Sequence, residues 1–285
     1  MKSFQNAVFI SGATGYAGRK IALHLAAQGE NLVVSGRDSG KLANFIKELA
    51  LAHPELEIAG VVCDLSKPGS WSQTTEDLMN YQFKGYINCS GIQGTLGKSL
   101  VINQETFQMV FNVNLHSSIY FTNFFFSNKV KSLPMSIIHF SGGGSTAGRP
   151  NFMAYSLSKT ALVRFVENFS IENPDQAFKV NAIAPGVMPS HMQEEILEDI
   201  NLEGTVDFKI AEEAMKSQYF ENQRLLLLCD FLMSEKSDGI SGKLISATWD
   251  NWEDWPKHLE SLKSSDLYTL RRIIGRDRGV SWGDL

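Results

Sequence analysis

A tyrosine and a lysine stand four residues apart, at Tyr155 and Lys159, in a segment whose apolar periodicity predicts a helix over residues 153–173. This spacing places both side chains on one face of the helix. A phenol normally loses its proton near pH 10, and a neighbouring ammonium group lowers that pKa because it stabilises the phenolate. The pair is therefore a candidate acid–base group. Because a chain with seven tyrosines can carry such a pair by chance, its interpretation depends on the surrounding elements.

Three glycines at positions 12, 15 and 18 follow a short apolar run, Ala7–Ser11, and open a segment with helical periodicity over residues 16–28. Positions without a Cβ let backbone N–H groups approach a pyrophosphate, and the positive end of the following helix faces the same anion. The alternative is a plain glycine-rich turn, but the position between the first strand and the first helix favours a dinucleotide phosphate loop. The loop residues expected to line the cofactor are Gly12, Thr14, Gly15, Tyr16, Ala17 and Gly18.

The corner after the second predicted strand, residues 31–35, bears on which dinucleotide binds. An acidic residue there would bind the ribose 2′-hydroxyl of NAD, whereas this chain has Gly36 and Arg37. A guanidinium can hold a 2′-phosphate, which favours NADP(H) over NAD(H), although a solvated arginine that starts the next helix is the alternative. Asp64 and Leu65, after the third strand, are expected beside the cofactor. The Asp64 carboxylate could contact the adenine amino group or equally cap the helix that follows.

These candidate residues must be positioned by an alternation of short apolar runs and amphipathic segments. Strands are predicted at residues 7–11, 31–35, 58–64, 85–90, 135–141, 178–184 and about 242–247. Helices are predicted at residues 16–28, 39–53, 104–131, 153–173 and about 220–234. Such an alternation predicts right-handed crossovers and a doubly wound parallel sheet, which is the Rossmann fold of the α/β class. No repeat or linker interrupts it, so residues 1–247 are expected to form a single domain.

Taken in order, these elements resemble the short-chain dehydrogenase/reductase (SDR) family over residues 6 to about 247. Gly12, Gly15 and Gly18 match its cofactor loop, and Asn88-Cys89-Ser90-Gly91 resembles its Asn-Asn-Ala-Gly element. Asn114 matches a helix asparagine of the family, and Tyr155 with Lys159 matches its active-site pair. Pro185-Gly186 followed by Ser190 resembles the element that holds the nicotinamide carboxamide. The cofactor contacts implied by this resemblance are Asn88, Ser90, Gly91, Tyr155, Lys159, Pro185, Gly186 and Ser190.

The resemblance implies an oxidoreductase that interconverts a secondary alcohol and a ketone by hydride transfer with NADP(H). Tyr155 would protonate the carbonyl oxygen, and Lys159 would bind the nicotinamide ribose and lower the pKa of the tyrosine. Asn114 would hold, through its backbone, a water molecule in a proton relay to the lysine. No metal is needed for this chemistry, and the six histidines and three cysteines lack ligand spacing.

Two features depart from the family pattern, the spacing of the loop glycines and the residue at position 142. The spacing Gly-x-x-Gly-x-x-Gly is closer to the extended, sugar-nucleotide-modifying branch, while the rest of the chain resembles the short branch. Gly142 occupies the position of the catalytic serine, thirteen residues before Tyr155. Ser141 or Ser145 could replace that serine. Alternatively, backbone N–H groups of the glycine run could polarise a carbonyl as an oxyanion hole does.

Residues 187–219 are expected to form a substrate lid, and residues 248–285 a C-terminal extension. Tryptophans and arginines in the extension could bind a sugar nucleotide, or the tryptophans could pack on the domain or on a neighbouring subunit. The favoured substrate is therefore a sugar or sugar nucleotide. A small or lipid-derived ketone is the alternative, and a catalytically silent NADP(H)-binding regulator is the alternative of another class.

Composition limits the partners and the compartment. The net charge of −5 gives no reason to expect nucleic acid, and no apolar run approaches the ~20 residues of a membrane helix. No targeting signal precedes the first strand, so we expect a cytoplasmic protein. The family resemblance implies a homodimer or homotetramer through the helices at 104–131 and 153–173. Phe121, Phe124 and Phe125 fit such an interface but also fit the core of a monomer.

Overall fold

Seven parallel strands form one sheet in the order β3-β2-β1-β4-β5-β6-β7. The computed structural model describes residues 5–98, 100, 102–130, 133–174, 177–216, 223–280 and 282. The strands are β1 Ala7–Ser11, β2 Leu32–Gly36, β3 Ile58–Val62, β4 Phe83–Asn88, β5 Met135–Phe140, β6 Phe178–Ala184 and β7 Leu244–Ser246. The strand order reverses between β1 and β4, which confirms the predicted doubly wound fold and places a ligand crevice at their carboxyl ends.

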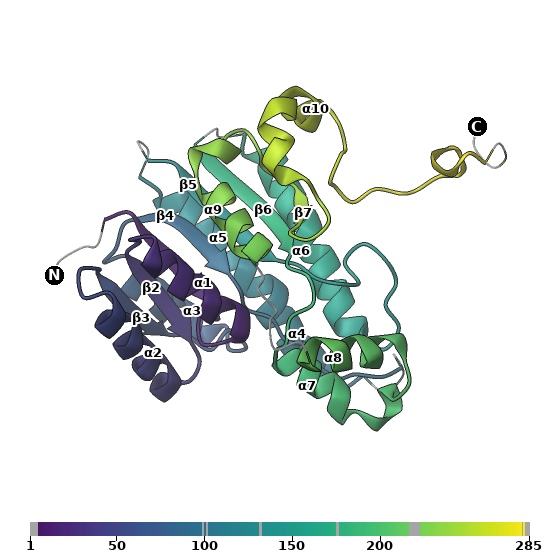
Figure 1. Cartoon of the computed structure of the whole chain (residues 1–285), viewed down its shortest axis with the longest axis horizontal. Helices are drawn as coiled ribbons and strands as arrows, with labels where there is room; N and C mark the ends of the chain where they lie inside the picture. The colour runs from purple at the N-terminus through teal and green to yellow at the C-terminus, as the bar shows by residue number, and fades with distance from the viewer. Residues whose placement is uncertain are drawn as a thin grey trace.

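Helices cover both faces of the sheet, and Figure 1 shows α1 and α9 lying across one of them. The helices are α1 Tyr16–Ala27, α2 Ser39–Ala52, α3 Gly69–Leu78, α4 Gln104–Phe111, α5 Ser117–Asn128, α6 Met153–Glu172, α7 His191–Glu198, α8 Val206–Lys216, α9 Gln223–Met233 and α10 Leu259–Ser264. Helices α1, α2 and α9 bury their apolar faces in one core. The opposite core receives α3, α5 and α6.

Strand β1 shows why the sequence folds into this three-layer arrangement. Val8 and Ile10 contribute to the core under α1 and α9, while Ala7 and Phe9 contribute to the opposite core. Side chains alternate between the faces of a strand, so a strand covered on both faces is apolar at most positions. The continuous apolar run Ala7–Ser11, all of it buried, meets that requirement.

The structure differs from the sequence expectations in several elements, among them helices α7, α8 and α10, for which no helix was predicted. Helix α3 was not predicted, because its polar sequence offers only Trp71 and Leu78 as large buried apolar residues. The single helix expected at 104–131 is α4, a π-helical segment at Asn112–His116 and α5 in succession. Strand β3 ends before the predicted Asp64. Lys131, residues 217–222 of the predicted lid and helix, and residues 1–4 lie outside the described part of the chain.

The C-terminal extension packs on the domain at its beginning and leaves it at its end. Trp252 and Trp255 are buried in the core under α1 and α9. A backbone hydrogen bond of 2.9 Å from Leu244 of β7 to Tyr268 then ties the extension to the edge strand. Leu270 still bonds to Glu167 and Arg164 of α6, and beyond it the chain runs away from the domain, at the upper right of Figure 1. The extension therefore lies along the β7 edge of the sheet.

Candidate active site

The glycine-rich turn connects the carboxyl end of β1 to α1, where the strand order reverses. A Cβ on Gly12, whose φ is +70°, would lie 2.8 Å from Ser90 Oγ, and a Cβ on Gly18 would lie 2.3 Å from the Gly12 carbonyl oxygen. These positions therefore need glycine to keep the turn tight. No side chain caps the first turn of α1, and no acidic residue stands in it. The backbone N–H groups of that turn, with the positive end of the helix, are available to an anion, so the turn fits a dinucleotide pyrophosphate.

The end of β2 lies next to this turn. A Cβ on Gly36 would be 2.9 Å from Thr14 Oγ1, so the glycine makes room for the threonine side chain. Arg37 is exposed and forms no ion pair within the described residues. The adjacent acid, Asp38, instead caps α2 by accepting a hydrogen bond from the Lys41 amide, which lowers the pKa of its carboxyl. Arg37 is thus an exposed cation of this corner that forms no ion pair with the described residues.

Asp64 and Leu65 both serve local structure. The Asp64 carboxylate accepts hydrogen bonds from the amide and the hydroxyl of Ser66, at 3.1 and 2.7 Å, and lies 3.3 Å from the Lys67 ammonium. Leu65 is buried in the core beside α3. Of the two expectations for Asp64, this geometry corresponds to the cap of a turn before α3.

Asn88, at the end of β4, joins three elements below the site. Its side-chain oxygen accepts from Ser11 Oγ at 2.8 Å and from the Ser90 amide at 3.1 Å, and its Nδ2 donates to Ser118 Oγ at 2.8 Å. Asn88 is almost fully buried, so these bonds satisfy groups that would otherwise be costly to bury. They hold the segment that leads to Ser90 and Gly91 against the glycine-rich turn.

Asn114 lies in the π-helical segment and is completely buried. Its side chain pairs with both backbone groups of Ile92, each at 2.9 Å, and donates to Ser158 Oγ at 2.9 Å. Its own backbone carbonyl accepts from Ser118 Oγ at 3.1 Å. Because a π-helical turn widens the helix locally, it is frequent at functional sites. Here it brings Asn114 beside α6, where Asn114 bonds to Ser158, the residue before Lys159.

Tyr155 and Lys159 lie one turn apart near the start of α6 and are only 7% and 2% exposed. The Lys159 Nζ donates to the Phe140 carbonyl, at the end of β5, over 2.6 Å, and lies 5.9 Å from the centre of the Tyr155 ring. Burial lowers the pKa of Lys159 to about 7 and raises the pKa of Tyr155. In the chain without cofactor, the cation that lowers the pKa of Tyr155 is Arg149, and the Lys159 ammonium is bonded to the Phe140 carbonyl. The expectation that Lys159 lowers the pKa of Tyr155 stays a prediction.

Gly142 lies directly against the Tyr155 hydroxyl. A Cβ on Gly142 would be 2.2 Å from Tyr155 Oη, a distance at which one of the two residues must move. The glycine at the family's serine position therefore makes room for the phenol. Ser141 is buried, and its hydroxyl has no hydrogen-bond partner within the described residues. Ser145 is also buried, and its amide donates to the Gly142 carbonyl at 3.2 Å.

Arg149 lies near Tyr155 and Gly143 and was not singled out from the sequence. Its guanidinium lies 3.6 Å from the centre of the Phe152 ring and donates to Asp207 Oδ1 of α8, from Nε at 2.9 Å and from the Nη2 atom at 2.8 Å. Arg149 is also the cation that partly offsets the raised pKa of Tyr155. The acid is 58 residues away in the chain, so no local pattern could reveal this pair.

The predicted lid forms helices α7 and α8 over the start of α6. Ile196, Leu202 and Ala211 pack against Phe152 and Tyr155 in a small third core. Ser190 is the residue before α7, and Gly186 has a φ of +85°. Pro185 is buried, whereas Gly186 is exposed on the approach to the lid.

Lid helix α7 is also tied to the segment after β4. The Gln93 side chain donates to the Met192 carbonyl at 2.7 Å and to Glu195 Oε2 at 3.0 Å. A Cβ on Gly91 would lie 3.4 Å from both Lys159 Nζ and the Met192 methyl group. The predicted site residues after β1, β4, β5 and β6 therefore surround one region at the carboxyl ends of the strands.

No group of three or more histidine, cysteine, aspartate or glutamate side chains in the described part of the chain could hold a metal ion. No described helix is both long and apolar enough to cross a membrane. Cys63, Cys89 and Cys229 are unpaired.

The sheet order and the glycine-rich turn define a Rossmann-type α/β protein. A family model described as enoyl-(acyl carrier protein) reductase matches residues 13–247. The chain therefore belongs to this family, within the short-chain dehydrogenases/reductases, and is an oxidoreductase. This assignment confirms the predicted family and enzyme class and removes the silent regulator from consideration.

Curated relatives and solved structures are similar over most of their length. The dehydrogenase/reductase SDR family member 4 of Rattus norvegicus is 24% identical over 249 residues, which is 83% of each chain. A diacetyl reductase of Staphylococcus epidermidis is 27% identical over 255 residues, covering 83% of this chain and 94% of its own. A short-chain dehydrogenase from Salmonella enterica serovar Typhi is 22% identical, with a TM-score of 0.73, and the match covers 86% and 96% of the two chains. The structure of YwfH, an NADPH-dependent reductase involved in bacilysin biosynthesis, is 23% identical with a TM-score of 0.73, over 85% and 96%.

Proposed function

We propose that this oxidoreductase reduces the ketone group of a small molecule with NADPH, and that Tyr155 donates the proton. The observation that carries the proposal is the buried phenol of Tyr155, one helical turn from Lys159, at the carboxyl ends of the strands. Burial raises the pKa of Tyr155, so the phenol keeps its proton at neutral pH. A protonated phenol suits the acid needed to reduce a carbonyl.

Each residue of the site has one task in this proposal. Bound NADPH supplies the hydride. Tyr155 donates its proton from Oη to the substrate oxygen. Lys159 would bind the nicotinamide ribose. Asn114 fixes the segment after β4 through its two bonds to Ile92 and holds a relay water through its backbone, which would return a proton toward Lys159.

The position of the substrate oxygen is set by the segment after β5. Gly142 has no side chain to offer, and the phenol lies directly against it. The Ser141 hydroxyl, buried without a partner in the described structure, supports a role for Ser141 in binding that oxygen. Ser145 and the backbone N–H groups of the glycine run are the other two candidates. In each case Tyr155 remains the proton donor.

A small ketone is supported better than a sugar nucleotide. Trp252 and Trp255 are buried in the domain core, so they offer no sugar platform. Arg271 is paired with Asp266 and Asp277 along the sheet edge. Trp249 of the same extension is 87% exposed, so the argument from the extension is weakened to a single exposed tryptophan there. One relative is named as a diacetyl reductase, which supports small ketones such as diacetyl as the first substrates to test.

The preference for NADPH is proposed from Arg37, the exposed cation beside Gly36 at the end of β2. Replacing Arg37 by Ala should weaken NADPH binding about tenfold or more and leave NADH binding unchanged, because only NADPH carries the 2′-phosphate. Fluorescence titration with both cofactors measures this. Lys41→Ala, on the exposed face of α2, is the matched control and should change neither affinity. Equal losses for NADPH and NADH in Arg37→Ala would contradict the assignment.

A further inference from the structure

A second cavity of about 740 Å³ lies at the edge of the sheet, far from Tyr155. Its walls come from the second half of α6, the start of β6, the connection into β7 and the C-terminal extension. Tyr155 and Ser170 are fifteen residues apart on α6, so the two sites are separated by about 22 Å along the helix axis. The volume falls in the range of small-molecule sites, which is roughly 300–1,000 Å³.

Positive charge dominates the lining of this cavity. The cations are Arg164, Lys179, Lys243 and Lys263, and the acids are Glu167 and Asp266. Both acids already have an arginine partner, because Arg164 pairs with Glu167 and Arg271 pairs with Asp266. Lys179 is paired with Asp238. Neither Lys243 nor Lys263 forms a close ion pair with the described residues, and the Glu167 and Asp266 carboxylates attract the Lys243 ammonium from further away.

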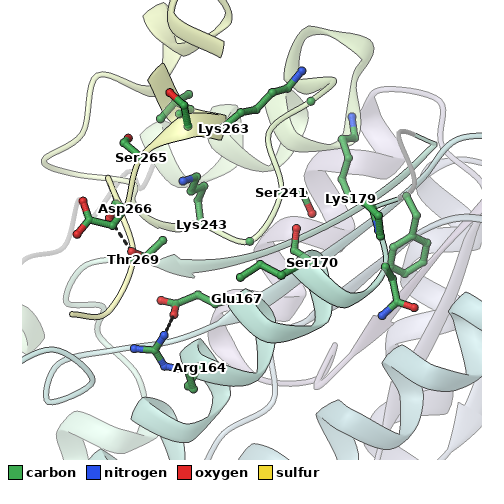
Figure 2. Close-up of a pocket in the computed structure, with 18 residues that line it drawn as sticks. Arg164, Glu167, Ser170, Lys179, Ser241, Lys243, Lys263, Ser265, Asp266 and Thr269 are labelled. Atoms are coloured by element: carbon green, nitrogen blue, oxygen red, sulfur yellow. Dashed lines mark hydrogen bonds and ion pairs between the residues drawn. The ribbon is translucent and has the colours of Figure 1, made fainter. Parts of the chain in front are cut away.

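Lys243 is placed to receive a ligand. Figure 2 shows its ammonium in the middle of the cavity, with Ser170 and Glu167 of α6 on one side and Lys263 of the extension on the other. The side chain is nearly buried, and its Nζ makes one hydrogen bond, to the Leu267 carbonyl at 3.0 Å. An ammonium group has three protons to donate, so two remain for a ligand. Lys179 differs, because its three protons are taken by Ser234, Ser237 and Asp238.

We propose that this cavity binds a small molecule that carries a phosphate monoester, with Lys243 as the buried anchor and Lys263 as the second cation. Two unpaired ammonium groups match the charge of about −1.5 to −2 that a phosphate monoester carries at neutral pH. Such a ligand would contact α6 and the extension at once. It would therefore hold the extension on the domain and stabilise the folded chain.

The test uses glycerol 3-phosphate as the probe and the full chain saturated with NADPH, so that the phosphate-binding turn after β1 is occupied. Glycerol 3-phosphate has no carbonyl group to be reduced, and glycerol controls for the part without phosphate. We expect glycerol 3-phosphate to raise the melting temperature saturably and glycerol to leave it unchanged. Chloride at matched ionic strength should not reproduce the effect, because screening alone is not specific for phosphate.

Three lysine variants decide where the probe binds. Lys243→Met should weaken the binding at least tenfold, and Lys263→Met should weaken it by a smaller factor. Lys236→Met, an exposed lysine outside the cavity, should leave it unchanged. If Lys243→Met fails to fold, Lys263→Met measured by calorimetry carries the test. Unchanged affinity in a folded Lys243→Met variant would overturn the proposal. If Lys243→Met does not fold, unchanged affinity in Lys263→Met would overturn it, as would an effect matched by chloride. Turnover and NADPH affinity are measured separately, so this outcome is distinguishable from a failure of the proposed reductase activity.

Discussion

At the scale of residues, the site combines a phenol that keeps its proton with a lysine that gives its proton up easily. Burial acts in opposite directions on the two groups, because it always disfavours the charged form. It raises the pKa of Tyr155 and lowers that of Lys159 to about 7. Nothing in the spacing of the two residues reveals this. The pair could be predicted from the sequence, but its protonation depends on burial and on the direction of the Lys159 ammonium.

The contact between Gly142 and the Tyr155 hydroxyl leads to a first prediction. Gly142→Ala should lower the free energy of unfolding by about 1–3 kcal/mol and reduce kcat, because its Cβ would displace the phenol. Gly143→Ala is the matched control, since the nearest atom to a Cβ there is 3.8 Å away. Denaturant unfolding and steady-state kinetics measure both effects. Equal behaviour of the two variants would show that the phenol does not rest against Gly142.

The lowered pKa of Lys159 predicts that NADPH binding takes up a proton. At pH 8 the free enzyme holds Lys159 mostly neutral, because its pKa is about 7. Acceptors on the bound ribose favour the ammonium, so about one proton should be taken up on binding at pH 8. The same linkage makes NADPH affinity fall as the pH rises through 7.

Calorimetry in buffers of different ionisation enthalpy counts these protons. Lys159→Met should show no uptake at pH 8, since it has no amine to protonate. Lys47→Met, on the exposed side of α2, is a control and should retain the uptake. Binding of NADPH to the wild-type chain at pH 8 without proton uptake would contradict the assigned state of Lys159.

At the scale of elements, short apolar runs predicted each strand of the sheet, because strands covered on both faces are largely apolar. The π-helical segment at Asn112–His116 was not predicted, since no local pattern marks it and its buried Asn114 pairs with Ile92, 22 residues earlier in the chain. Helix α3 was missed for a related reason. It buries few large apolar residues, and Trp71 is fixed by a hydrogen bond to the Leu65 carbonyl at 3.3 Å.

The ion pair between Arg149 and Asp207 joins the loop after β5 to lid helix α8. Asp207→Asn keeps the guanidinium but weakens this tie, so we expect KM to rise about two- to tenfold with little change in the pH profile. Arg149→Met should raise KM similarly. It should also move the basic limb of the pH profile to higher pH, because Arg149 lowers the pKa of Tyr155.

Steady-state kinetics from pH 6 to 11 separate these effects of the Arg149–Asp207 pair. Arg164→Met, on the far half of α6, should change neither KM nor the pH profile near Tyr155. A pH profile that is unchanged in Arg149→Met would show that the guanidinium does not act on the phenol.

At the scale of the whole molecule, the C-terminal extension could be recognised from the sequence but not placed. Its tryptophans suited a sugar site or a packing role, and only the fold shows that Trp252 and Trp255 lie in the core. Phe121 and Phe125 are likewise buried within the chain, so they no longer support a subunit interface. The homodimer or homotetramer remains a prediction from the family. The sheet, the lid and the extension together leave the catalytic residues at one end of α6 and the charged cavity at the other.

The most direct test of the central claim is turnover by Tyr155→Phe, which removes only the phenolic oxygen. With NADPH and diacetyl, or another ketone that the wild-type chain reduces, we expect the rate to fall about a hundredfold or more, because general acid catalysis is lost. The NADPH dissociation constant should stay within about twofold. Tyr268→Phe, whose ring lies against Trp255 in the C-terminal extension, is the matched control and should retain activity. A Tyr155→Phe variant that keeps the wild-type rate would contradict the account of Tyr155 as the proton donor.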